Sequence, residues 1–242
     1  MLLQDKVALI TGAGRGIGKA IALAFAAEGA DLVLCSRTAS QVRAVGDEVR
    51  GCGRRCLALA ADVGRAEDVE RVVAEALREF GRIDVLVNNA GISRDKPFVD
   101  TSLTDWHDTL AVNLYGVVYC LQAVLPGMLA RGSGSIINIA SGAGQRGLPG
   151  NSAYSAAKAG VIALSHALAD EVGAQGVRVN VISPGPIKTE MLAASPLQGF
   201  LLKGNVKLLP AEDVAGAALF LASDLSGGMS SQVLTIRNTN RW

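Results

Sequence analysis

The chain has 242 residues, half of them hydrophobic, and a formal net charge of +1 at pH 7. This length and apolar content are enough for one large core. The small, scattered charge argues against a nucleic acid or a membrane surface as the main partner. The N-terminal residues show no export signal, so we expect a cytoplasmic protein. We also expect no membrane-spanning helix, because charged and glycine residues at 28–31 interrupt the most apolar run.

Short apolar runs alternate with amphipathic stretches along the whole chain. The nearly continuous apolar runs are typical of strands covered on both faces, and they predict strands at 6–10, 31–36, 56–60, 83–88, 135–140, 177–182 and 232–236. The amphipathic stretches predict helices at 16–29, 38–51, 66–80, 104–131, 151–174 and 211–222. Pro126 should kink or interrupt the fourth helix, and Pro210 should begin the last one.

Strict alternation of strands and helices predicts an α/β fold with a doubly wound parallel sheet of seven strands and helices on both faces. No linker rich in proline, glycine or serine divides the chain, so we expect a single domain over 1–242. Ligands of such sheets bind at the carboxyl ends of the strands, where the polar and glycine-containing segments of this chain fall.

A glycine-rich turn joins the first predicted strand to the first predicted helix, with the sequence Thr11-Gly12-Ala13-Gly14-Arg15-Gly16-Ile17-Gly18. Such a turn lets the backbone approach a pyrophosphate, and the N–H groups at the start of the helix face the negative charge. The spacing is Gly-x3-Gly-x-Gly, which an ordinary turn into a helix could also have. The loop predicts a nucleotide cofactor.

The end of the second predicted strand bears on which nucleotide binds. It reads Ser36-Arg37 and offers no carboxylate to a ribose 2′-hydroxyl. Arg37, together with Arg15 of the glycine turn, could instead hold a 2′-phosphate. This favours NADP(H), with NAD(H) as the alternative cofactor. In the competing interpretation both arginines are ordinary surface charges.

The reactive groups concentrate in Tyr154-Ser155-Ala156-Ala157-Lys158. Tyr154 and Lys158 are four residues apart and share one face of a helix. A nearby ammonium group, with the positive nicotinamide of an oxidised cofactor, should lower the phenol pKa and make Tyr154 a usable acid and base. Ser141, at the end of the fifth strand, can donate a hydrogen bond to a carbonyl that gains negative charge. A solvent-exposed Tyr–Lys pair is the other interpretation.

These motifs together resemble the classical short-chain dehydrogenase/reductases along almost the whole chain. The shared features are the glycine turn, Asp62-Val63, Asn88-Asn89-Ala90-Gly91, Asn113, Ser141, Tyr154-x3-Lys158, and Pro184-Gly185 with Thr189. The resemblance implies a Rossmann-type fold and a catalytic group of Asn113, Ser141, Tyr154 and Lys158. In that family the tyrosine is the acid/base, the serine orients the carbonyl, the lysine also holds the nicotinamide ribose, and the asparagine keeps a water in the proton relay.

The resemblance also implies the cofactor contacts. It suggests that Asp62 and Val63 meet the adenine and that Ile187 and Thr189 meet the carboxamide. The full predicted cofactor set is Gly12, Arg15, Gly16, Ile17, Gly18, Arg37, Asp62, Val63, Asn89, Ala90, Gly91, Tyr154, Lys158, Pro184, Gly185, Ile187 and Thr189. A homotetramer, or else a homodimer, is expected on the same basis.

The segment from about 186 to 209 corresponds to the family's mobile lid over the substrate. Its leucines could line an apolar pocket or pack the lid on the body of the protein. The stretch from Asn88 to Ile92, followed by Ser93-Arg94-Asp95, resembles the 3-oxoacyl-carrier-protein reductases, and their activity is one alternative function. The acidic or neutral stretch 168–175 does not suit an acidic carrier, and only Arg131 remains as a candidate contact.

The C-terminus departs from the family, because the segment from Gln232 to Trp242 begins as the family's last strand does but lacks the Asp-Gly-Gly that usually follows it. This change keeps open an alternative of another class, a non-catalytic NADP(H)-binding sensor or partner subunit. His107 and His166 have no acidic or cysteine residues at metal-ligand spacing, so we predict no metal site. The most economical interpretation is an NADP(H)-dependent oxidoreductase acting on a small-molecule carbonyl or secondary alcohol.

Overall fold

The computed structural model describes residues 1–201 and 208–237. In this part of the chain seven parallel strands form one sheet, in the order β3-β2-β1-β4-β5-β6-β7. Their bounds are β1 Val7–Thr11, β2 Asp31–Ser36, β3 Cys56–Ala60, β4 Val85–Asn88, β5 Gly134–Ile139, β6 Val177–Pro184 and β7 Val233–Ile236. The predicted doubly wound α/β fold is confirmed, with each strand starting and ending within two residues of its predicted bounds.

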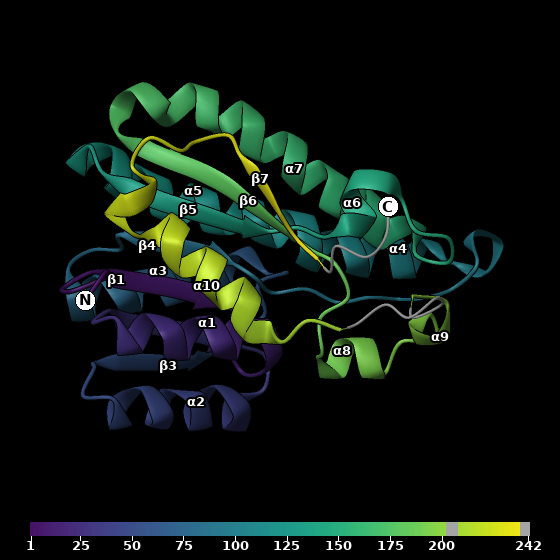
Figure 1. Cartoon of the computed structure of the whole chain (residues 1–242), viewed down its shortest axis with the longest axis horizontal. Coiled ribbons are helices and arrows are strands. Elements are labelled where there is room, and N and C mark those ends of the chain that lie inside the picture. Colours follow the sequence, from purple (N-terminus) through teal and green to yellow (C-terminus); the bar gives the residue numbers. More distant parts are fainter. Residues whose placement is uncertain (202–207, 238–242) are drawn as a thin grey trace.

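The helices connect the strands and cover both faces of the sheet (Figure 1). Their bounds are α1 Gly16–Ala27, α2 Ala39–Gly51, α3 Ala66–Phe80, α4 Leu103–Leu110, α5 Gly116–Arg131, α6 Gly142–Arg146, α7 Ser152–Val172, α8 Glu190–Ala193, α9 Gln198–Leu201 and α10 Ala211–Ala222. The short helices α6, α8 and α9 were not predicted. All three lie beyond the carboxyl ends of the strands, where Figure 1 shows them grouped at one end of the sheet.

Two apolar clusters fill the space between the sheet and its helices. On one face Phe25 of α1 and Leu221 of α10, both fully buried, pack with α2 against the sheet. On the other face α3, α5 and α7 pack against it, with Met128 and Val161 fully buried. Alternate residues of one strand face opposite clusters, as Leu9 and Ile10 do. This packing explains why the strands read as continuous apolar runs.

The stretch predicted as one helix at 104–131 differs from the prediction in its interior. The helix runs through Pro126, and the irregularity lies earlier, at a π-helical turn over Ala111–Tyr115 between α4 and α5. Leu103–Arg131 is also long and apolar enough to cross a membrane by length and composition, although the sequence predicted no such segment. A core helix of a soluble protein passes the same test, and residues such as Cys120 and Val124 pack under the sheet.

A buried chain of hydrogen bonds connects the centre of the sheet to α7. The Asn88 amide on β4 donates to the Asn138 side chain on β5 at 2.9 Å. The Asn138 amide donates to the Ser165 hydroxyl on α7 at 2.8 Å, and that hydroxyl donates to the carbonyl of Val161 at 2.6 Å. Asn138 is fully buried, so these bonds are shielded from water. They fix α7 relative to the sheet.

We expect Asn138→Ala to lower the free energy of unfolding by about 2–3 kcal/mol, because Asn88 and Ser165 lose buried partners. Urea denaturation of the single variants Asn138→Ala and Asn88→Ala and of the double variant measures the coupling. A coupling energy of about 1 kcal/mol is expected for groups in one network. Strictly additive losses would show that the network does not act as a unit.

Candidate active site

A cavity of about 700 Å³ opens at the carboxyl ends of the strands. The order of the sheet reverses between β1 and β4, and a crevice at such a point is the usual ligand site of this architecture. All but two of the predicted site residues line the cavity. Those that do are Gly12, Arg15, Gly16, Ile17, Arg37, Asp62, Val63, Asn89, Ala90, Gly91, Ser141, Tyr154, Lys158, Pro184, Gly185, Ile187 and Thr189. Gly18 and Asn113 lie behind the wall.

The glycine loop is packed tightly against the end of β4. The Thr11 hydroxyl accepts hydrogen bonds from the backbone N–H groups of Asn89 and Ala90, at 3.0 and 3.1 Å. Gly12 has a φ of +64°, and a Cβ there would lie 2.8 Å from the Ala90 Cα. A Cβ on Gly18 would lie 2.4 Å from the Gly12 carbonyl oxygen. Gly18 therefore supports the loop from behind and permits its close packing.

The start of α1 fits a pyrophosphate. Arg15 occupies the N-cap position, and its side chain makes no capping hydrogen bond to the first turn. The backbone N–H groups of that turn therefore have no side-chain cap and point outward from the helix end. The residues present fit the phosphates of a dinucleotide. A Cβ on Gly16 would lie 3.3 Å from the Thr189 Cγ2, so the segment after β6 borders this loop.

The two arginines predicted to read the cofactor are both exposed and both border the cavity beside the glycine loop. Arg37 follows β2, and Arg15 precedes α1. Within residues 1–201 and 208–237 neither side chain has a protein carboxylate as a salt-bridge partner. Asp62 forms part of the same end of the cavity, and its carboxylate accepts the N–H of Gly64 at 3.0 Å. This end offers two guanidinium groups to an anion.

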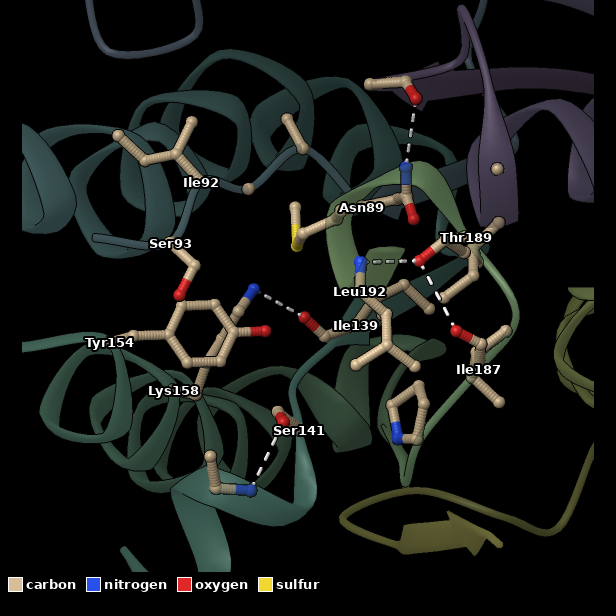
Figure 2. A pocket seen from close by; sticks show the side chains of 18 of the residues that line it. Asn89, Ile92, Ser93, Ile139, Ser141, Tyr154, Lys158, Ile187, Thr189 and Leu192 are labelled. Atoms are coloured by element: carbon tan, nitrogen blue, oxygen red, sulfur yellow. Dashed lines mark hydrogen bonds between the residues drawn. The ribbon is translucent and has the colours of Figure 1, made fainter. Parts of the chain in front are cut away.

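Tyr154, Lys158 and Ser141 meet on the opposite part of the cavity wall (Figure 2). Both residues of the helical pair come from the first turns of α7, and the Lys158 Nζ lies 5.7 Å from the centre of the Tyr154 ring. Lys158 is 2% exposed and donates a hydrogen bond to the Ile139 carbonyl at 2.8 Å. Ser141 caps α6, and its hydroxyl accepts the N–H of Ala143 at 3.1 Å. The interpretation of Tyr154 and Lys158 as a solvent-exposed pair is therefore wrong, because Lys158 is buried.

The protein by itself raises the pKa of Tyr154, whereas the predicted lowering includes the positive charge of an oxidised nicotinamide. Burial raises the pKa of the phenol, and the Asp95 carboxylate raises it further, while a hydrogen bond with Ser141 lowers it. Burial also lowers the pKa of Lys158 from its usual 10.5 to about 8. Desolvation disfavours both charged forms because the cavity wall removes water from them. The protein without a bound cation therefore holds Tyr154 in its neutral, proton-donating form.

Asn113 lies one layer behind the cavity, in the π-helical turn. Its amide donates to the carbonyls of Ile92 and Thr109, each at 2.9 Å, and its oxygen accepts the N–H of Ile92 at 3.2 Å. A Cβ on Gly91 would lie 2.8 Å from that oxygen and 3.7 Å from the Lys158 Nζ. Asn113 therefore fixes the loop after β4, and both of its amide protons bond to protein carbonyls.

A hydrogen-bond cluster that the sequence did not identify closes one side of the cavity. The Asp95 carboxylate accepts hydrogen bonds from Ser93 and Ser195, and the Asn151 amide donates to Ser93 at 2.9 Å. Ser195 is 100 residues from Asp95 along the chain, so no local pattern could predict the contact. Arg146 and Arg237 also line the cavity without having been predicted.

Leucines in the segment expected to be a lid both line the cavity and pack against the body of the protein. Leu192 and Leu197 line the cavity, whereas Leu209 packs against the core and pairs with Ile187 in a short parallel bridge. Part of the predicted lid, 202–207, lies outside the described residues. The candidate carrier contact, Arg131, uses its guanidinium to donate to the Ile83 carbonyl at 2.6 Å.

Comparisons with known proteins agree with this geometry. The family model described as short chain dehydrogenase matches residues 6–198. The chain is 44% identical to (2S)-[(R)-hydroxy(phenyl)methyl]succinyl-CoA dehydrogenase subunit BbsD of Thauera aromatica, over 98% of this chain and 96% of that protein. It is also 44% identical to a 3-oxoacyl-[acyl-carrier-protein] reductase of Synechocystis, over 92% and 91% of the two chains.

The solved structures lead to the same family. The crystal structure of levodione reductase superposes with a TM-score of 0.93 at 34% identity and covers 97% of each chain. The match therefore extends over the sheet and the cavity together. The chain belongs to the short-chain dehydrogenase family of oxidoreductases.

Proposed function

We propose that the protein is an NADP(H)-dependent oxidoreductase that moves a hydride between the nicotinamide and a carbonyl or secondary-alcohol substrate. The observation that carries this proposal is the meeting of Tyr154, Ser141 and Lys158 on one wall of a cavity whose other end holds the glycine loop. The catalytic domain comprises the whole chain, 1–242, with 186–209 as the lid over the substrate.

In this mechanism Tyr154 donates its phenolic proton to the carbonyl oxygen as the carbonyl carbon receives the hydride, and it removes that proton in the reverse reaction. A nicotinamide cofactor held by the glycine loop would supply or accept the hydride. The Ser141 hydroxyl hydrogen-bonds the oxygen that gains charge. Lys158, whose ammonium group lies beside the phenol, stabilises the tyrosinate that remains. Asn113 is a positioning residue, because its hydrogen bonds hold the loop after β4 against Lys158.

Two features support NADP(H) over NAD(H). The end of β2 carries Arg37 where an acidic residue would be needed for a ribose hydroxyl. Arg15 borders the same end of the cavity, so a 2′-phosphate would meet two guanidinium groups. In this proposal the pyrophosphate binds at the first turn of α1, and Asp62 and Val63 face the adenine.

A second candidate function is 3-oxoacyl-[acyl-carrier-protein] reductase, which the relative from Synechocystis favours. Arg131, the one carrier contact that the sequence offered, is exposed and donates one hydrogen bond to the Ile83 carbonyl, so it stays a candidate contact. A relative named as D-threitol dehydrogenase, 41% identical, shows that similar chains have other substrates. A protein that binds NADP(H) without turnover is the remaining alternative.

We also propose that the chain assembles as a homotetramer or homodimer. Large apolar side chains are exposed on α4 and next to it, with Leu103 at 76% and Val99 at 88% exposure. Leu225, 68% exposed, lies in the short turn that follows α10. Burying such residues between copies of the chain would remove them from water.

Absorbance of NADPH, with NADH in parallel, tests the function against ketones, diketones, 3-ketoesters and a 3-oxoacyl thioester. Oxidation of NADPH by one class supports the proposed reaction and identifies its substrate chemistry. Preference for the carrier-linked thioester would favour the second candidate. NADPH binding without oxidation across the panel would favour the non-catalytic alternative.

Tyr154→Phe should lower kcat by at least 10²-fold, because only the proton donor is removed. NADPH affinity should stay within about 3-fold, since the ring remains. Tyr119→Phe, which removes the same atom from a tyrosine on α5 outside the cavity, serves as the control. Full activity of Tyr154→Phe would exclude the proposed acid.

Arg37→Asp should shift the ratio of kcat/KM for NADPH over NADH by at least 10-fold toward NADH. The change removes a phosphate partner and supplies an acceptor for the ribose hydroxyl. Arg43→Asp makes the same change of charge on the exposed surface of α2 and should leave the ratio unaltered. Equal ratios in Arg37→Asp and wild type would make Arg37 a surface charge only.

The buried Lys158 should also make stability depend on pH. Its pKa of about 8 in the folded protein lies below the usual 10.5, so the unfolded chain binds more protons between those values. Stability contributed by this group therefore rises with pH from 8 to 10.5. Urea titrations at pH 7 to 10 measure the free energy of unfolding at each pH. Between pH 8 and 10 this free energy should rise less, or fall more steeply, in Lys158→Met than in wild type. Parallel curves would contradict the assigned shift.

A further inference from the structure

A carboxylate in the loop between β4 and α4 borders the cavity, and its neighbours along the chain do not neutralise it. This group is Asp95. Arg94 forms an ion pair with Asp108 at 3.4 Å, and Lys96 forms one with Asp105 at 2.7 Å. In the described part of the chain no ion pair includes Asp95, and the groups that hydrogen-bond its carboxylate are hydroxyls. The cavity wall therefore carries a negative charge at this loop.

Two serine hydroxyls hold this carboxylate in place. Ser93 donates to one carboxylate oxygen, and Ser195, in the segment after α8, donates to the other. A carboxylate has about four acceptor positions, so the Asp95 carboxylate can accept further hydrogen bonds from a ligand. Because the two serines belong to different segments of the chain, the direction of the carboxylate is fixed before any ligand binds.

Asn151 provides a second acceptor next to Asp95. The Asn151 amide nitrogen donates to the Ser93 hydroxyl at 2.9 Å, because Ser93 uses its own proton on Asp95. The other end of that side chain, Oδ1, has no hydrogen-bond partner among the described residues. Asn151 is 7% exposed and lines the cavity. A buried oxygen without a donor costs stability, so a donor on a ligand would remove that cost.

These two acceptors lie close to the proposed acid. Asn151 is the N-cap of α7 and Tyr154 comes three residues later, a spacing that makes side chains neighbours on a helix. Ser93, which joins Asn151 to Asp95, lies on the same side of the cavity as Tyr154 in Figure 2. The Asp95 carboxylate also raises the pKa of Tyr154. A substrate whose carbonyl oxygen meets Tyr154 therefore has its nearby atoms turned toward Asp95 and Asn151.

The chemistry of the two acceptors selects the group that they bind. A carboxylate and an amide oxygen both need a donor, because neither has a proton to give. A carboxylate or phosphate on the substrate would be repelled by Asp95. An ammonium group would attract Asp95 but would be repelled by the Lys158 ammonium group, which lies 5.7 Å from the centre of the Tyr154 ring. A neutral hydroxyl group satisfies the acceptors without either repulsion.

We propose that Asp95 and Asn151, here called the acceptor pair, bind a hydroxyl group of the substrate close to its reacting carbonyl. The substrate is then a hydroxy ketone or, in the reverse direction, a diol or polyol. This inference rests on the proposed function, because it assigns a substrate class to the same cavity. Ile92, Leu148 and Leu197 also line the cavity, so the acceptor pair supplies polar contacts in a partly apolar wall.

Binding to protein saturated with NADPH tests the acceptor pair without turnover, because an alcohol cannot accept a hydride. Four alcohols differ in one substituent: propane-1,2-diol carries a hydroxyl, butan-2-ol a methyl, 1-aminopropan-2-ol an ammonium and 3-hydroxybutyrate a carboxylate. In ligand-observed NMR titrations the diol should bind wild type about 10-fold or more tightly than each of the others. Equal or tighter binding of any other alcohol, or no binding of the diol, would overturn the proposal.

Two variants test whether this preference comes from the acceptor pair. Asp95→Asn removes the charge, so the preference for the diol over 3-hydroxybutyrate should fall about 10-fold or more. Asn151→Ala should weaken the diol about 3-fold or more and leave butan-2-ol unaltered. Asp108→Asn makes the first change on the exposed surface of α4 and should alter neither ratio. NADPH affinity within about 3-fold of wild type shows that a variant is folded. Wild-type ratios in both Asp95→Asn and Asn151→Ala would overturn the acceptor pair.

Turnover distinguishes failure of the acceptor pair from failure of the proposed function. Hydroxyacetone and butan-2-one are the ketones of the diol and of butan-2-ol. The ratio of their kcat/KM values should fall about 3-fold or more in Asn151→Ala, and their intrinsic reactivities cancel in this comparison with wild type. Oxidation of NADPH with an unchanged ratio would overturn the acceptor pair and leave the reaction supported. Diol binding that depends on the pair, without oxidation of NADPH by any ketone, would overturn the reaction and leave the pair supported.

Discussion

The close packing of the glycine loop against the end of β4 is the constraint on which the rest of the site depends. The Thr11 hydroxyl accepts hydrogen bonds from two backbone N–H groups just after β4. Gly12 lies so close to Ala90 that a side chain at Gly12 would clash with it. This contact spans the point where the order of the sheet reverses. It therefore fixes the start of α1 relative to the loop after β4, and the cavity lies between these two elements.

The side chains proposed to react are held by contacts within the sheet and between the sheet and α7. Asn88, Asn138 and Ser165 form a buried chain of hydrogen bonds that connects the two central strands to α7. Lys158 adds a bond from α7 to the end of β5. These contacts are inaccessible to water and orient the turn of helix that carries Tyr154. The position of the phenol is thus determined by packing beneath the site, before any ligand binds.

Different parts of the cavity wall treat charge differently. The wall around Tyr154 disfavours both tyrosinate and ammonium, so the protein alone keeps the phenol protonated. The end of the cavity beside the glycine loop, by contrast, carries the two exposed guanidinium groups of Arg15 and Arg37. In the proposed mechanism, catalysis depends on the position of the phenol more than on a preformed tyrosinate.

The sequence by itself determined the alternation of seven strands with helices, because apolar periodicity and glycine turns are local properties of the chain. It also identified the glycine loop, Ser141 and the Tyr154–Lys158 pair, whose spacing follows from helix geometry. Only the tertiary structure decided that Asn113 lies behind the cavity wall and that the irregular turn falls there instead of at Pro126. The structure alone also brought Ser195 to Asp95 and Arg237 to the cavity of Arg146. These contacts join residues far apart along the chain, so no local sequence pattern predicts them. The burial that raises the pKa of Tyr154 also depends on residues distant in the sequence.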